Sequence, residues 1–69
     1  MREFDDLQYD NIRKQVSDKI GQRKSDWLFY NVVAYLYPNQ IVFKDGKKVK
    51  VKDEKEMVDA LIERALEEI

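Results

Sequence analysis

Residues 40–69 carry the pattern that most constrains the fold of this chain. Two short apolar segments, 41–43 and 49–51, stand on either side of an Asp-Gly pair, and an amphipathic segment, 53–69, follows them. An Asp-Gly pair between two β-prone segments is a strong hairpin signal, because both residue types accept the positive φ angles of a tight turn. We therefore expect an antiparallel β-hairpin that leads directly into a helix.

The hairpin has two candidate registers. A two-residue loop, 45–46, would pair Val42 with Val49 and would put apolar side chains and lysines on the same face. A three-residue loop, 44–46, with its glycine left-handed, would instead bring four large apolar side chains onto one face: Ile41, Phe43, Val49 and Val51. We predict the three-residue loop, because burial of one apolar face specifies the register of a strand pair.

Opposite charges are separated along this part of the chain. Residues 39–52 contain five lysines and one aspartate, a net charge of +4, whereas residues 53–69 contain seven acidic and two basic residues, a net charge of −5. Asp53 is expected to cap the last helix, and Glu56 has the spacing of the second half of a capping box. Apolar residues at helical spacing define its buried face: Met57, Val58, Leu61, Ile62, Ala65, Leu66 and Ile69. Acidic residues define its solvent face: Glu54, Asp59, Glu63, Glu67 and Glu68.

Residues 5–20 have the pattern of an amphipathic helix. Four apolar side chains fall near one stripe: Leu7, Ile12, Val16 and Ile20. Gly21 is expected to end this helix, since glycine accepts the backbone conformation that follows a helix C-terminus. Residues 22–24 would then form a polar connection.

A second helix is predicted over residues 27–37, with Ser25 as its N-cap. The aromatic and β-branched residues of this segment favour a strand, and a strand is the alternative. The length of the segment and its entry cap favour a helix, which should end before Pro38. The predicted order is α-α-β-β-α, an α+β fold in which three helices pack with one antiparallel β-hairpin in a single domain, 1–69.

Size and composition restrict the chemistry further. The chain has 69 residues with no cysteine and no histidine, so it lacks disulfides, thiolate metal sites and the commonest transition-metal ligand. The longest apolar run, 27–37, is about half of the ~20 residues that span a bilayer. The acidic N-terminal residues do not resemble a secretory signal. We expect a cytoplasmic protein with no membrane partner.

The sequence does not contain a usable catalytic set. Ser17 and Ser25 are the only serines, and no histidine, cysteine or threonine accompanies them. A pair of Ser25 with Lys24 is the alternative that remains open. Acidic residues at a spacing of four share a helix face, where solvated side chains are the ordinary interpretation. We predict a protein that is not an enzyme and uses no cofactor, metal or small-molecule substrate.

Aromatic residues favour protein binding as the function. Trp27, Tyr30 and Tyr37 would share one stripe of the second helix, and a domain this small is not expected to bury every ring. Exposed tryptophan and tyrosine are the residue types that anchor interfaces. We therefore predict a small regulatory or accessory protein that binds another protein, or itself as a homodimer, through these three residues.

Two alternatives depend on charge. The first is nucleic-acid binding through the hairpin lysines Lys47, Lys48, Lys50 and Lys52, which could lie along phosphates. The same lysines could instead protect an edge strand from aggregation, and an acidic helix beside them would repel a nucleic acid. The second alternative is that the acidic last helix mimics a nucleic-acid backbone and inhibits a nucleic-acid-binding protein.

Overall fold

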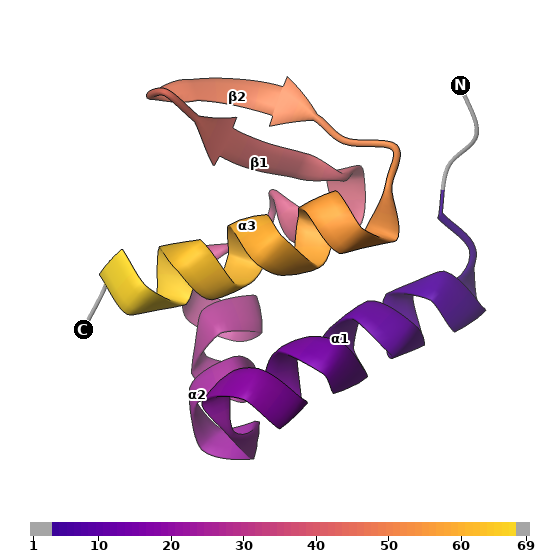
Figure 1. Ribbon diagram of the computed structural model, residues 1–69, viewed down its shortest axis with the longest axis vertical. Coiled ribbons are helices and arrows are strands. Elements are labelled where there is room, and N and C mark those ends of the chain that lie inside the picture. The colour runs from indigo at the N-terminus through magenta and orange to yellow at the C-terminus, as the bar shows by residue number, and fades with distance from the viewer. Residues whose placement is uncertain (1–3, 68–69) are drawn as a thin grey trace.

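The computed structural model describes residues 4–67 of the chain, and its elements follow the order α-α-β-β-α of an α+β fold, as predicted. The elements are α1 (Asp6–Ile20), α2 (Gln22–Trp27), a π-helical segment η1 (Leu28–Val32), a 3-10 segment η2 (Tyr37–Asn39), β1 (Ile41–Lys44), β2 (Lys47–Lys50) and α3 (Glu54–Glu67). Figure 1 shows α1 and α3 packed along each other, with the hairpin on the far side of α3 from α1. No helix in the described part of the chain is long and apolar enough to cross a membrane.

α1 begins at a capping box. The backbone N–H of Gln8 donates to Asp5 at 2.8 Å, and the N–H of Asp5 donates to the side chain of Gln8 at 2.9 Å. Ile12 and Val16 are fully buried, but Leu7 is 68% exposed, so its place in the stripe was predicted wrongly. Five residues separate Leu7 from Ile12, which is about 140° around a helix.

Residues 22–24 do not form the predicted polar connection, because they are the first residues of α2. Gly21 has a φ of 89°, and this one residue both ends α1 and precedes α2. Ser25 lies inside α2, is 1% exposed and accepts a hydrogen bond from the hydroxyl of Ser17 at 2.9 Å. The N-cap prediction for Ser25 was therefore wrong, because the serine joins α2 to α1 instead of starting a helix.

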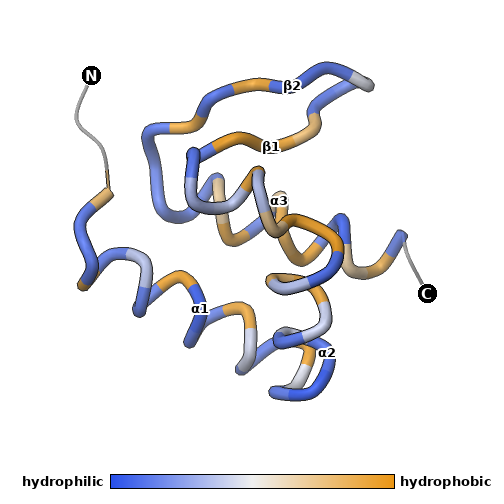
Figure 2. The backbone as a smooth tube through the Cα atoms, turned by 180° about the vertical axis from the view of Figure 1, so that it is seen from behind, coloured by the Kyte–Doolittle hydropathy of each residue, from blue (hydrophilic) through white to orange (hydrophobic). Residues whose placement is uncertain are grey.

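The chain from Leu28 to Asn39 is helical in two short pieces, not one. The π-helical η1 is followed by a turn and then by η2, which contains Pro38. The strand alternative is excluded, and the uninterrupted helix was wrong too. Aromatic and β-branched residues have modest helix propensity, and they run together between α2 and β1. Figure 2 shows orange, hydrophobic stretches in the tube between these two elements.

The hairpin adopts the two-residue loop, so the predicted three-residue loop was wrong. Val42 pairs with Val49, and Phe43 pairs with Lys48. Asp45 and Gly46 have φ angles of 55° and 77°, which is the pattern of a type I′ turn whose twist matches that of the strands. This turn geometry outweighs the apolar face, and it leaves Phe43 41% and Val49 37% exposed.

α3 carries the apolar face that its periodicity predicts. Met57, Val58, Leu61 and Ala65 are buried, but Leu66 is 60% exposed, and Glu68 and Ile69 lie outside the described residues. The Asp53 side chain accepts from the N–H of Lys55 at 3.2 Å, as a cap should. The carboxylate of Glu56 instead accepts from Lys44 at 3.2 Å, so its capping-box role was predicted wrongly.

Candidate interaction surfaces

The aromatic patch is formed by Trp27 of α2, Tyr30 of η1 and Arg13 of α1. Trp27, the last residue of α2, is 37% exposed, and Tyr30, in the π-helical η1, is 64% exposed. The guanidinium of Arg13, on α1, donates to the Tyr30 hydroxyl at 3.1 Å and lies over the rings of Phe29 and Tyr30. This hydrogen bond raises the pKa of Arg13.

Tyr37 does not join this patch. It is 8% exposed, its hydroxyl donates to the carbonyl of Tyr9 at 2.9 Å, and its ring packs against Tyr9 and Phe29. Burial raises the pKa of the Tyr37 hydroxyl. Tyr37 is a core residue, and its predicted place on an exposed surface was wrong because the chain turns after Val32 and directs this side chain inward.

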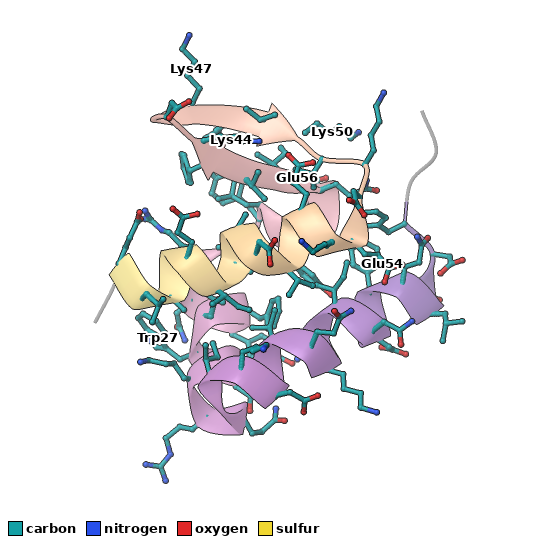
Figure 3. All side chains as sticks on the ribbon, viewed as in Figure 1. Trp27, Lys44, Lys47, Lys50, Glu54 and Glu56 are labelled. Carbon is teal, nitrogen blue, oxygen red and sulfur yellow. The ribbon has the colours of Figure 1, made fainter. Side chains whose placement is uncertain are left out.

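The hairpin lysines form a basic surface. Lys47, Lys48, Lys50 and Lys52 are all exposed, and within residues 4–67 no ion pair includes any of them. Figure 3 shows Lys47 and Lys50 at the top of the molecule, separated from Trp27 by α3. Trp27 and the hairpin lysines therefore lie on different sides of α3.

Two exposed rings that the sequence-based site did not include stand beside these lysines. The ammonium of Lys48 lies 4.8 Å from the ring centre of Tyr35, which is 56% exposed. Phe43 is the cross-strand partner of Lys48, and the guanidinium of Arg64 lies 5.3 Å from its ring centre. The sequence contained a signal for this arrangement, because the two-residue loop pairs Phe43 with Lys48.

The seam between β1 and α3 is hollowed. One hollow of about 610 Å³ has the buried side chains of Leu36 and Leu61 among its walls, with Arg64 and Glu67 on the α3 side. A second hollow of about 320 Å³ shares several wall residues with the first: Val42, Phe43, Lys44, Ala60 and Glu63. The two hollows therefore follow one seam between β1 and α3, lined by both apolar and charged residues.

The solvent face of α3 is acidic but not uniformly so. Asp59, Glu63 and Glu67 are exposed at a spacing of four residues. Lys55 pairs with Asp59 at 3.8 Å, and Arg64 pairs with Glu67 at 3.6 Å. Across residues 4–67, no group of three acidic side chains is arranged to hold a metal ion.

Comparisons of this chain with protein-family models, with curated proteins and with solved structures found no match. Its function is therefore argued from the aromatic patch, the basic hairpin and the seam.

Proposed function

We propose that this protein is a non-enzymatic binding module that recognises another protein through the aromatic patch. The observation that carries the proposal is the exposure of aromatic rings. Of the eight aromatic residues in the chain, four are more than a third exposed: Trp27, Tyr30, Tyr35 and Phe43. Exposed tryptophan, tyrosine and arginine together are the composition of binding hot spots.

Arg13 supports this role by holding Tyr30 in place before a partner arrives. Its hydrogen bond and its position over two rings restrict the rotation of an exposed side chain. A ring that is already ordered loses less conformational entropy on binding.

The chain contains no cysteine, which supports a reducing compartment, and we place the protein in the cytoplasm on that ground.

The partner can be captured and then measured. A photo-crosslinking amino acid at position 30 should capture it in cells, and the same group at Asn11, exposed on α1, gives the background. With the captured partner purified, Trp27→Ala and Tyr30→Ala should each raise Kd by about tenfold or more.

Leu7→Ala is the matched control, because it truncates a side chain that is 68% exposed on another part of the surface. It should leave Kd within about twofold of the parent value. Circular dichroism should show that all three variants fold, since none of the three side chains is buried. Parent-like affinity in both Trp27→Ala and Tyr30→Ala would reject the aromatic patch as the binding site.

Nucleic-acid binding through Lys47, Lys48, Lys50 and Lys52 is the second candidate function. It is favoured by the exposure of these lysines and by the neighbouring Tyr35 ring, on which a base could stack. The acidic α3 beside the hairpin opposes it. In a nucleic-acid titration the affinity should then fall steeply as the salt concentration rises. The double variant Lys48→Glu with Lys50→Glu should abolish binding. Equal binding by that double variant would eliminate this candidate.

Mimicry of a nucleic-acid backbone by α3 has less support. A mimic needs a continuous anionic strip, whereas Lys55 and Arg64 pair with carboxylates on the solvent side of α3.

A further inference from the structure

The basic hairpin and the acidic helix are neighbours in space as well as in sequence. Lys44 of β1 and Glu56 of α3 form an ion pair at 3.2 Å, and α3 runs beneath the hairpin (Figure 1). One region of the surface therefore carries a positive half and a negative half side by side. A nucleic acid complements only the positive half, whereas a partner with the same two halves in reverse order complements both.

The charges on the two halves repeat at nearly the same interval. Lys48 and Lys50 are two residues apart on one face of β2, about 6.6 Å along a strand. Asp59, Glu63 and Glu67 are four residues apart on α3, about 6 Å along a helix. A strand carrying these two lysines can therefore lie along a helix carrying these carboxylates with each lysine near a carboxylate.

The seam between the two halves includes an exposed aromatic ring. Phe43, in its wall on β1, is 41% exposed, whereas the wall residues Leu36 and Leu61 are each 2% exposed. An apolar centre with a polar rim is the usual anatomy of a protein interface. The Lys55–Asp59 pair is exposed, so it stabilises the monomer little and can be exchanged for a pair with a partner.

We infer that a second copy of this chain covers the seam, with the hairpin of each copy lying on α3 of the other. A two-fold axis through the seam generates this contact. In a two-fold interface, any contact from the first copy to the second is repeated from the second copy to the first. Both halves of the charge pattern are then matched twice, and the exposed Phe43 rings become buried. This self-association uses a surface other than the aromatic patch, which stays open for a different protein.

The test is the mass in solution by light scattering after size exclusion, over a dilution series at low and high salt. The parent protein should form a species of twice the monomer mass of 8.3 kDa at low salt. High salt should weaken it, since the Debye length falls from ~10 Å at 0.1 M to ~3 Å at 1 M. Lys48→Glu with Lys50→Glu should be monomeric, and so should Asp59→Lys with Glu63→Lys.

Mixing the two charge-reversed proteins should restore the dimer, because each then presents the charge that the other lacks. The control is Lys14→Glu with Lys19→Glu, on exposed residues of α1. It makes the same charge change as Lys48→Glu with Lys50→Glu and should leave the dimer intact. Circular dichroism establishes that each variant folds before its mass is interpreted.

Three results would overturn the inference. The first is a parent protein that is monomeric at every concentration in low salt. The second is a dimer that survives both charge reversals but is lost with Trp27→Ala and Tyr30→Ala, which would make the aromatic patch the self-interface. The third is a monomer whose hairpin lysines bind nucleic acid. Loss of the dimer alone leaves the proposed partner binding of the aromatic patch standing, so the two proposals fail separately.

Discussion

At the scale of single residues, the core depends on two polar side chains whose burial the sequence did not reveal. Gln40 is 2% exposed, accepts from the N–H of Phe4 at 2.7 Å and donates to the carbonyl of Val51 at 2.9 Å. It thereby joins the start of the chain to the end of the hairpin, in a left-handed conformation with φ of 59°. Tyr37 is the other such side chain, and its burial makes the stability of the fold depend on pH.

Tyr37 should make the fold less stable in alkali. Burial holds the pKa of its hydroxyl above the ordinary value of 10.0, so below pH 10 both folded and unfolded chains are protonated and the full stability is present. Above that pH the unfolded chain releases this proton while the folded chain retains it, and the free energy of unfolding falls by ~1.4 kcal/mol per pH unit.

Tyr37→Phe removes this proton and isolates the effect. At neutral pH the variant should be about 1 kcal/mol less stable, because the hydrogen bond from the Tyr37 hydroxyl to the Tyr9 carbonyl is lost. Urea denaturation should show the parent losing this advantage between about pH 10 and about pH 11. A constant difference between parent and variant over that range would mean that Tyr37 ionises as easily in the folded state.

At the scale of elements, the type and order of the structure could be predicted, but the places where the chain turns could not. The periodicity of α3 and the Asp-Gly hairpin are local signals and were predicted, but the loop length of the hairpin and the capping-box role of Glu56 were predicted wrongly. The break after Val32 is not local, since it depends on how η1 packs on the rest of the core. That break places Tyr37 in the core, seven residues after Tyr30, where an uninterrupted helix would have kept both on one face.

The hairpin turn shows how one backbone angle decides the register. Asp45 has a positive φ in the observed two-residue loop, whereas a three-residue loop that begins with a type I turn gives this position a negative φ. Asp45→Ala should therefore cost about 1 kcal/mol, because alanine tolerates the left-handed conformation poorly. Asp45→Asn should be neutral, since asparagine accepts it. Chemical denaturation measures both, and equal stability of the two variants would indicate the other register.

At the scale of the whole molecule, small size is the main constraint. A domain of about 60 residues buries only ~60% of the surface that its unfolded chain exposes, so its stability is marginal. This chain has no disulfide to compensate, and it leaves Phe43 and Val49 of the hairpin partly exposed. A second copy over the seam would add the buried area that one copy lacks.

The melting temperature should consequently depend on protein concentration. Because only folded chains form the dimer, mass action raises the apparent stability as the protein concentration rises above the dimer Kd. At low salt the Tm of the parent protein should increase by a few degrees for each kcal/mol gained, as expected for a domain of this size. Lys48→Glu with Lys50→Glu should melt at one temperature at every concentration, and Lys14→Glu with Lys19→Glu should behave like the parent. A flat Tm in the parent protein would show that one copy is stable alone and that the charge pattern of the hairpin and α3 serves some other contact.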